Sequence, residues 1–544
     1  MRNHIWVLNG IICDILSSKK TLPIDIGIYD YRQCFDSLWL QECMNDIYKG
    51  GIQDDKFALL FNINTHVNMA VKTPVGKTKR GVITNSIIQG DVFGPMMCGK
   101  QVDEIGQECL LQGKYTYKYK GEVDIPPLAM LDDLISISEC GHKTAMAHSY
   151  IKFKTSSKKL QFGSQKCKKM HIGKTKDEYK CNPLLVDNWM EVIEECEAGK
   201  IRIEDICDGE QIMEEKDDER YLGDIISKDG RNIKNIQARV NKGTGIVKNI
   251  LTYLDGIPFG KFHFEAGILL RNSLLVSSML FNSEAWYNVT DSELNLLETV
   301  DLMLLRGILK APKSTPKEMM FLELGLLPFR EIIRKRRLSF LSYILKEKKD
   351  SMLYKFFECQ KSNKTKKDWI TTISKDMEIL NIDMTFEDIR NMKKTMFVNM
   401  VKRKIEYKTL MDYSKIKEGH SKVKNLKHTT LKLQKYLNKN ANLKKDECQM
   451  IFKLRSGVTD VKVNQKWKYE SYECDGCEKY EETQEHVLHC EEIRKMQTNN
   501  IENIEILYEK VMNGKLEDHV ETIQEENGHF FKNKKKYKTM LFAQ

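Results

Sequence analysis

The sequence predicts an α+β fold, in which a first part that mixes strands with helices is followed by a long, mostly helical part. In "PIDIGIYD", residues 23–30, isoleucine alternates with polar or small residues, and this period of two indicates a half-buried strand that ends at Asp30. From about residue 232 the apolar residues recur every three or four positions instead, as on one face of a helix. With 544 residues, of which 41% are hydrophobic, the chain is long enough for several domains.

The first part continues to about residue 174 with short predicted elements. The run "FDSLWLQECMNDIYKG" has helical spacing and stops at Gly50 and Gly51, and the alternating tyrosines of "KYTYKYKGEV" indicate another strand. The apolar runs "PLAM" and "LISIS" then flank Asp132 and Asp133. Two charged residues between two strand-like runs predict a tight hairpin with both acids at its tip.

The helical part contains two amphipathic helices with clear signals. "TDSELNLLETVDLMLLRGIL" opens on a capping box from Thr290 to Glu293 and carries an apolar stripe. The second helix, "REIIRKRRLSFLSYILKEKK", carries a cationic cluster that we expect on or near its polar side, where it would bind nucleic acid: Arg334, Lys335, Arg336 and Arg337. After this helix, a linker, "KSNKTKKDW" at residues 361–369, leads into a lysine-rich helical region that runs to about residue 460.

The basic charge of the chain is concentrated in one region. The whole sequence has 87 Lys and Arg against 77 Asp and Glu, whereas residues 402–445 hold 14 basic and 3 acidic residues, which leaves the remainder almost neutral. Such a region suits a polyanion, nucleic acid first and an anionic membrane surface second. It is equally typical of a solvated, lysine-rich helix face.

The sequence has no signal for membrane insertion or secretion. No apolar run reaches roughly 18 residues, and the N-terminal stretch lacks the small-residue cleavage site of a signal peptide. The 15 cysteines are scattered, apart from one pair with CxxC spacing, which is unlike a disulfide framework. We therefore expect a reducing compartment, the nucleus or the cytoplasm.

The adjacent acids Asp132 and Asp133 differ in context from the two other such pairs, at 54–55 and 217–218. Those pairs lie in polar stretches, where a solvated turn accounts for them, whereas this pair is flanked by apolar runs. Adjacent ionised carboxylates repel each other, and a divalent cation relieves the repulsion. Two hard metal ions about 3.5–4 Å apart need carboxylates from more than one segment, and Asp30, at the end of a predicted strand, is the expected partner.

A second candidate metal site lies in "CDGCEKYEETQEHVLHC", residues 474–490. Its spacing, C-x2-C-x8-H-x3-C, provides three thiolates and one imidazole for tetrahedral Zn²⁺, from Cys474, Cys477, His486 and Cys490. His489, next to Cys490, is the alternative to His486 as the fourth ligand. A zinc clip that only holds a small C-terminal core together is one interpretation of this pattern.

Five motifs, in this order, resemble those of reverse transcriptases. "IYDYRQCFDSLW" is similar to the first metal-binding motif, "SIIQGDVFGPMMC" to the second and "AMLDDLISIS" to the third, which in that family is an aromatic-x-Asp-Asp hairpin. "LQFGSQKCKKMHIGK" resembles the lysine-bearing motif that follows, and "YLGDIISKDGR" resembles the primer grip. The versions seen here, and the cysteine-histidine knuckle, are similar to those of non-LTR (LINE-type) retrotransposon polymerases, over roughly residues 1–350 and the C-terminal region.

The resemblance implies a role for each motif residue. Asp30 and Asp132 would hold two Mg²⁺ ions, or Mn²⁺ in their place, and Asp133 would assist them. Lys166 would neutralise or protonate the leaving pyrophosphate. Phe35 would be the steric gate against a ribose 2′-hydroxyl, and Gln89 and Gly90 would lie along the incoming nucleotide and the template. The sequence departs from the family at Met130, where the family has Tyr or Phe.

The fold that the resemblance implies is a right-hand polymerase. Residues 1–231 would be the palm with partial fingers, 232–360 a helical thumb, 361–470 a basic helical connector, and 471–544 a CCHC-type zinc knuckle with a basic tail. Only about 29 residues precede Asp30, so we expect most of the fingers to be missing, as in an N-terminally truncated element. The knuckle would bind nucleic acid.

The implied function is RNA-directed DNA polymerisation by two-metal nucleotidyl transfer, primed from a nicked target site. The expected partners are an RNA template, a DNA primer or target site and deoxynucleoside triphosphates, with no membrane partner. Two alternatives stay open. One is a catalytically impaired remnant that only binds nucleic acid, and the other is an RNA-dependent RNA polymerase, which would be expected to have a polar residue at the position of Phe35.

Overall fold

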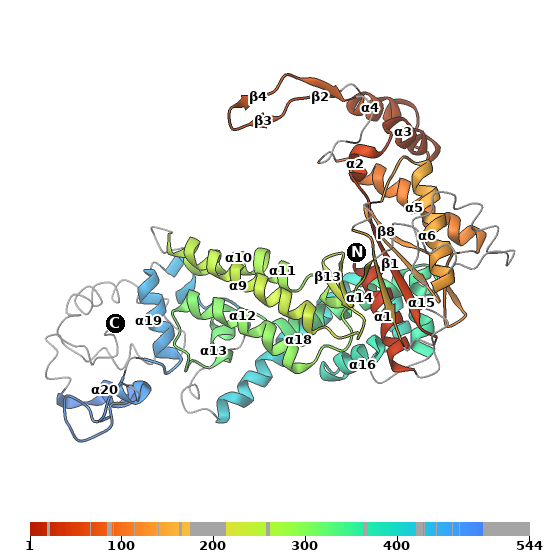
Figure 1. The fold of residues 1–544 in the computed structure, drawn as a ribbon. Helices are drawn as coiled ribbons and strands as arrows, with labels where there is room; N and C mark the ends of the chain where they lie inside the picture. The colour runs from red at the N-terminus through yellow and green to blue at the C-terminus, as the bar shows by residue number, and fades with distance from the viewer. Residues whose placement is uncertain are drawn as a thin grey trace. The chain divides into compact units, whose positions relative to one another are not determined.

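The structure is a computed structural model in which the chain forms two compact units. It describes residues 1–18, 22–65, 67–83, 87, 90, 92–113, 115–139, 141–162, 166–173, 214–256, 262–362, 368–419, 428, 430–441, 443–459, 461–466 and 468–492. Unit 1 consists of Met1–Asn235, Ala285–Asn288 and Tyr343–Lys375, and unit 2 of Ile236–Glu284, Val289–Ser342 and Asp376–Gln544 (Figure 1). The two units alternate along the chain, unlike the contiguous domains predicted from the sequence.

Unit 1 is built on a five-stranded sheet with the strand order β11-β10-β1-β9-β8. Strand β1 (Ile24–Asp30) lies in the middle and pairs antiparallel with both β9 (Asp133–Ser138) and β10 (Lys168–Ile172). Strand β8 (Leu128–Met130) pairs antiparallel with β9, and β11 (Glu214–Glu215) pairs parallel with β10. The predicted strand that ends at Asp30 is confirmed, and so is the α+β class of the fold.

Helices cover this sheet. Helix α6 (Gly141–Ser157) packs on β9 and β1, α5 (Gly94–Gln112) on β8, and α1 (Arg2–Ser17) on β10. Short helices α2 (Cys34–Ser37) and α3 (Leu40–Lys49) follow β1 and contact α5. Apolar side chains of α2, α3 and α5 form one buried cluster with Tyr29, Leu134 and Ile151. The end of β1 that carries Asp30 therefore packs against a hydrophobic core.

The segment of residues 343–375 completes unit 1. The Trp6 ring of α1 packs edge-on against Phe356 of α15 (Met352–Ser362), with a centroid distance of 5.1 Å, and against Trp369 at 5.3 Å. Trp6 and Trp369 are fully buried. The domain boundary predicted at 360/361 therefore differs from the observed division, because this segment returns to unit 1 after the chain has entered unit 2.

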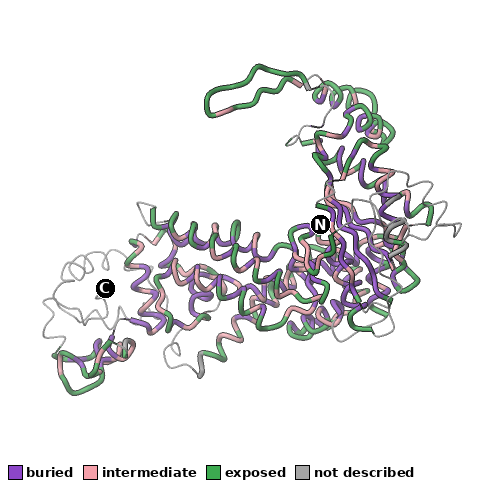
Figure 2. Tube along the Cα trace, viewed as in Figure 1, coloured by how far each residue is buried: buried purple, intermediate pink, exposed green. Residues whose placement is uncertain are grey.

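A narrow two-stranded ribbon follows α4 (Asp54–Asn64) in unit 1 (Figure 1). Strand β2 (Val67–Met69) pairs with β5 (Gly81–Ile83), and β3 (Lys72–Thr73) pairs with β4 (Gly76–Lys77). Figure 2 shows it exposed along most of its length. Two further hairpins join β6 (Tyr117–Tyr119) to β7 (Val123–Ile125) and β12 (Asp218–Tyr221) to β13 (Asp224–Ser227).

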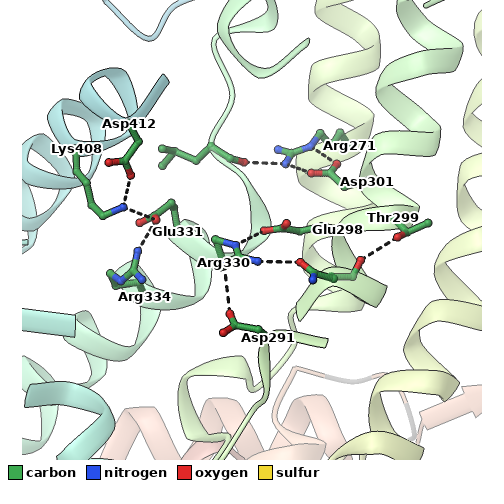
Figure 3. Close-up of polar contacts among 12 residues, drawn as sticks. Arg271, Asp291, Glu298, Thr299, Asp301, Arg330, Glu331, Arg334, Lys408 and Asp412 are labelled. Atoms are coloured by element: carbon green, nitrogen blue, oxygen red, sulfur yellow. Dashed lines mark hydrogen bonds and ion pairs between the residues drawn. The ribbon is translucent and has the colours of Figure 1, made fainter. Parts of the chain in front are cut away.

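Unit 2 is mainly helical in its described residues, as the pattern from residue 232 predicts. The predicted capping box is present at α12 (Asp291–Leu309): the Glu293 amide donates to Thr290 Oγ1 at 3.3 Å and the Thr290 amide donates to Glu293 Oε2 at 2.8 Å. A π-helix, Arg271–Val276, links α10 (His263–Leu270) to α11 (Ser277–Met279). Its Arg271 is buried and donates to both carboxylate oxygens of Asp301 at 2.6 Å (Figure 3).

The remaining described helices lie along the second half of the chain. They are α9 (Ile233–Asp255), α13 (Lys317–Leu324), α14 (Phe329–Lys346), α16 (Trp369–Ile379), α17 (Phe386–Asn391), α18 (Lys394–Gly419), α19 (Lys445–Arg455) and α20 (Gln484–His489). Among the described residues, no helix combines the length and the apolar character that crossing a lipid bilayer requires.

Candidate functional site

The three aspartates singled out in the sequence lie at one end of the central strands of unit 1. Asp30 is the last residue of β1, and its Cα partner in the antiparallel register is Asp133, the first residue of β9. Asp132 occupies the loop just before β9. Residues about a hundred positions apart are thus neighbours, because antiparallel pairing places the end of one strand beside the start of the next.

The predicted hairpin is confirmed, with one refinement. Met130 and Asp133 are paired residues, so the loop consists of Leu131 and Asp132, and only Asp132 is at the tip. Leu131 has φ +59°, a value that a two-residue hairpin often requires at its first loop position and that usually calls for glycine. Its side chain packs against the apolar cluster beside β1, which holds the backbone in this costly conformation.

Electrostatic repulsion marks this end of the sheet. Burial raises the pKa of the Asp133 carboxyl, and the negative charges of Asp132 and Asp30 raise it further. Asp132 is exposed, while Asp30 and Asp133 are half-buried, so all three remain in reach of solvent and ions. Hard oxygen donors that repel one another fit the ligand chemistry of Mg²⁺.

Lys166 lies beside Asp30, two residues before the neighbouring strand β10. Its Nζ is 3.1 Å from Asp30 Oδ1. The register that pairs Ile28 with Lys168 brings the residue two positions before β10 opposite Asp30, at the same edge of the sheet. The Lys166 side chain is 69% exposed, so its ammonium group can leave Asp30 and meet an anion without rebuilding the fold.

The residues expected to contact the nucleotide are placed in part. Phe35 lies on α2, five residues after Asp30, with its ring half-buried against the apolar cluster that also contains Tyr31 and Leu38. Its carbonyl accepts a hydrogen bond from the Ile87 amide at 3.1 Å, which places Ile87 next to α2. Gly90 is exposed with φ +96°, a conformation that favours glycine. Gln89 lies outside the described residues.

Tyr221, the first residue of the motif "YLGDIISKDGR", supports the candidate site from β12. Its hydroxyl donates to the Leu128 carbonyl at 3.2 Å and so braces β8, the strand that leads into the hairpin. Burial, and then the Asp133 charge, raise the pKa of Tyr221, so its phenol stays protonated and remains a donor. The position of this tyrosine at the start of the motif could have indicated a role, but the sequence does not show that its hydroxyl binds the Leu128 carbonyl.

The predicted zinc ligands come together in unit 2. Cys474, Cys477, His486 and Cys490 each offer one ligand atom, and these four atoms all lie within 4.8 Å of one another. Cys474 Sγ is 3.9 Å from Cys490 Sγ, and Cys477 Sγ is 3.3 Å from His486 Nε2. Bond lengths of about 2.3 Å to sulfur and 2.0–2.1 Å to nitrogen imply edges of roughly 3.8 and 3.6 Å in a tetrahedral zinc site. The cluster therefore fits Zn²⁺.

Local structure holds these ligands in place. The Cys474 amide donates to the Tyr480 carbonyl and the Glu478 amide to the Cys474 carbonyl, both at 2.8 Å, which folds the CxxC segment into a tight turn. Thr483 Oγ1 accepts from the His486 amide at 3.0 Å and starts helix α20 there. His486, and not His489, belongs to the cluster, so the structure selects between the two histidines.

Among the described residues this is the one cluster of three or more potential metal ligands whose ligand atoms approach so closely. Asp30, Asp132 and Asp133 do not form a second one. Their arrangement brings three carboxylates to one edge of the sheet, with Lys166 occupying an oxygen of Asp30.

The cationic cluster of α14 differs from the prediction. Arg337 donates to both carboxylate oxygens of Asp376, at 2.7 and 3.0 Å, and Arg334 Nε donates to Asp376 Oδ1 at 3.0 Å. Arg334 also pairs with Glu331, as Figure 3 shows, and Arg336 donates to the Leu280 carbonyl. Lys335 is half-buried, and burial, with the nearby Lys402, lowers its pKa. The three arginines therefore make their contacts within unit 2 and do not lie free on an open face.

Comparison with known proteins gives no family assignment. No protein-family model matches the chain, and no curated protein matches it either. A functional proposal for this chain therefore rests on the residues and the geometry described above.

Proposed function

We propose that this chain is an RNA-directed DNA polymerase whose active site lies at the Asp30 end of the unit 1 sheet. The observation that carries the proposal is the register that pairs Asp30 with Asp133 and sets Asp132 in the adjoining hairpin loop. The resemblance of five ordered motifs to those of non-LTR reverse transcriptases supports it. In this proposal unit 1 contains the palm of a right-hand polymerase and the helices of unit 2 contain its thumb.

The donor set of the site suits two divalent cations. When bound, Mg²⁺ or Mn²⁺ would lower the pKa of the primer 3′-hydroxyl and offset the charge of the triphosphate. Asp30 and Asp132 would hold the ions, because they come from two different segments and both reach solvent. Asp133 would assist these two ligands from the start of β9, where its carboxylate is repelled by both Asp132 and Asp30.

The other residues of the site act on the nucleotide. Lys166 would exchange Asp30 for the leaving pyrophosphate, to which it would bring a positive charge and a proton. Phe35 would exclude the 2′-hydroxyl of a ribonucleotide, and its ring is held in place by the apolar cluster behind it. Phosphodiester formation would then depend on positioning and charge neutralisation, with little covalent chemistry asked of the protein.

The zinc cluster of unit 2 would serve nucleic-acid binding in this proposal. Tyr480 is 65% exposed, and the centroid of its ring lies 5.4 Å from that of the His486 ring. In the stretch just before the cluster, Lys466 and Lys468 lie over the rings of Tyr472 and Tyr469. Such groups stack on bases and contact phosphates. The partners would be an RNA template, a DNA primer or nicked target site, and deoxynucleoside triphosphates.

Primer extension on an RNA template tests the proposal. Full-length, zinc-loaded protein with Mg²⁺ and deoxynucleotides is expected to extend the primer, and Asp132→Ala is expected to lose this activity by several orders of magnitude. Asp55→Ala is the matched control, since Asp55 is an exposed aspartate of another adjacent pair in the same unit. Product that is equal for wild type and Asp132→Ala, or absent from folded wild type, would contradict the proposal.

The second candidate is a nucleic-acid-binding protein without polymerase activity. The observation that favours it is the zinc cluster, whose four ligand atoms are already together while the three aspartates form no comparably close group. Tight RNA or DNA binding by a folded protein that gives no extension product at any Mg²⁺ or Mn²⁺ concentration would support this candidate over the polymerase.

A further inference from the structure

The exposed ribbon of unit 1, residues 67–83, carries positive charge without any negative charge. Between residues 56 and 90 the sequence contains no Asp or Glu, while Lys72, Lys77, Lys79 and Arg80 lie in or beside the ribbon strands. All four are exposed, and in the part of the chain that the structure describes no carboxylate pairs with any of them. The charge of this arm is therefore available to an external anion.

Two of these lysines repel each other across the ribbon. Lys72 of β3 and Lys77 of β4 are Cα partners in the antiparallel register, which places their side chains on the same face. Like charges directly opposite in a sheet are destabilising unless a counter-ion lies between or beside them. A polyanion bound along this face would remove the repulsion.

The tip of the ribbon is preorganised although it has no core. Thr73 Oγ1 donates to the Gly76 carbonyl at 2.9 Å, and Pro74 restricts the backbone of the loop between them. Further along, the Thr78 amide donates to the Val71 carbonyl at 3.0 Å and the Val71 amide donates to Thr78 Oγ1 at 2.9 Å. An isolated two-stranded hairpin is only marginally stable in water, so these hydrogen bonds and Pro74 hold in place a tip that a binding partner would stabilise further.

The dimensions of the arm favour double-stranded DNA. The major groove of B-form DNA, about 12 Å wide, admits a two-stranded β-ribbon, whereas the major groove of an A-form duplex is too narrow. The tip residues Thr73, Val75 and Gly76 offer little for reading base edges, and lysines contact phosphates whatever the sequence. The expected contact is therefore with the backbone of the duplex.

We propose that the ribbon of residues 67–83 binds the phosphate backbone of a B-form DNA duplex, with Lys72 and Lys77 as its principal contacts. The proposal rests on the proposed function for its premise that the chain works on nucleic acid. It deepens that function, because it assigns contact with duplex DNA, such as the nicked target site named there, to one segment of unit 1.

Lysine footprinting on the wild-type, zinc-loaded chain is the first test. Acetylation of Lys72, Lys77 and Lys79 is measured by mass spectrometry with and without a 30-base-pair DNA duplex, and the exposed Lys348 and Lys349 serve as internal references. Slower acetylation of the three ribbon lysines, with the references unchanged, is the expected result. No protection by the duplex would overturn the proposal, and so would protection only by single-stranded RNA or by anionic phospholipid vesicles.

Charge variants give the second test. Lys72→Gln/Lys77→Gln is expected to reduce the slope of log K against log salt for duplex binding by about 1.8, or about 0.9 for each lost phosphate contact. Lys348→Gln/Lys349→Gln removes the same charge from another exposed site and should leave the slope unchanged. An equal slope change in both pairs would overturn the proposal.

A third variant separates binding from folding of the arm. Lys72→Glu creates an opposite-charge pair with Lys77, which favours the ribbon while it removes a phosphate contact. Its duplex affinity should fall as far as that of Lys72→Gln or further; unchanged affinity would overturn the proposal. Polymerase activity is read independently on the same preparations: an active enzyme with unprotected lysines defeats this inference alone, and protected lysines without primer extension defeat only the proposed function.

Discussion

At the scale of single residues, Asp133 is the carboxylate of the candidate site that is repelled by both of its acidic neighbours. Its carboxyl has a pKa above the usual value because of burial and of the charges on Asp132 and Asp30. A carboxyl whose folded pKa exceeds its unfolded pKa holds more protons in the folded state, so stability falls as the pH rises from the unfolded value through the folded one. At neutral pH this group therefore opposes folding until a cation offsets the charge.

Mg²⁺ is accordingly expected to stabilise the protein near neutral pH. At ten times its Kd a bound ion adds about 1.4 kcal/mol to the free energy of unfolding, and the gain should shrink as the pH falls and the carboxyls take up protons. Thermal unfolding with increasing MgCl₂ measures the effect. Asp132→Asn should lose most of the gain and Asp55→Asn should keep it, and an equal gain in both variants would contradict the site.

Leu131 offers a test that reverses a usual order of stability. Ala is ordinarily better than Gly in a strand or helix by about 0.5–1 kcal/mol, whereas at φ +59° a side chain costs about 1–2 kcal/mol that glycine avoids. Both Leu131→Ala and Leu131→Gly lose the same packing against the core, so Leu131→Gly should be the more stable by about 1 kcal/mol in urea unfolding. A more stable Leu131→Ala would show that the loop backbone is not strained.

Among helices, strands and clusters, the sequence predicts best those features that depend on residues close together in the chain. Period-two alternation defines β1 to its last residue, and the spacing of cysteines and histidine gives the zinc cluster. The contacts of Arg334 and Arg337 were not predicted, because a run of cations does not identify its partners and Asp376 lies about forty residues downstream. The left-handed conformation at Leu131 could not be predicted either, because leucine rarely adopts a positive φ.

The zinc cluster can be tested with two neighbouring histidines on α20. His486→Ala should weaken zinc binding strongly, by at least tenfold, because it removes one of four ligands. His489→Ala is the control, since that residue lies outside the cluster on the same helix. Zinc content after competition with a chelator measures the effect, and thiol alkylation of Cys477 should rise with zinc loss. Equal zinc retention in both variants would exclude His486 as a ligand.

Helix α14 depends on Asp376 for its charge balance. Asp376 is buried and accepts hydrogen bonds from both Arg334 and Arg337. Asp376→Ala leaves the buried Arg337 guanidinium without a carboxylate partner, while Arg334 keeps its pair with Glu331. We expect a loss of about 3–5 kcal/mol in the free energy of unfolding. The double variant Arg337→Met/Asp376→Ala should recover part of the loss, whereas independent, additive effects would contradict a direct pairing.

For the whole molecule, the division into units could not be predicted from composition or spacing. The motif order suggests successive domains, but residues 343–375 and 285–288 belong with the first 235 residues. This return depends on packing between Trp6, Phe356 and Trp369, which are far apart in the sequence. Apolar residues on a helix predict burial and give no information about which distant element covers them.

Unit 1 is therefore expected to need residues 343–375. Trp369→Ala should destabilise it by about 3–5 kcal/mol, as for other large buried side chains, whereas Trp39→Ala, at a ring that is 42% exposed, should cost little. A fragment of residues 1–235 should unfold without a cooperative transition in urea. Cooperative unfolding of that fragment, with Trp369→Ala no worse than Trp39→Ala, would show that unit 1 is complete without the returning segment.

Because the two units alternate along the chain, the last segment of unit 1 is synthesised well after its first. Unit 1 starts at the N-terminus, yet its last segment ends at Lys375, about 140 residues after Asn235. At roughly 5–20 residues per second the ribosome needs about 7–28 seconds to supply that stretch. Throughout this interval the apolar side of α1, with Ile5, Trp6 and Leu8, lacks its final cover on the nascent chain. A pause in translation before residue 375 should thus promote chaperone capture or aggregation, while a pause after it should not.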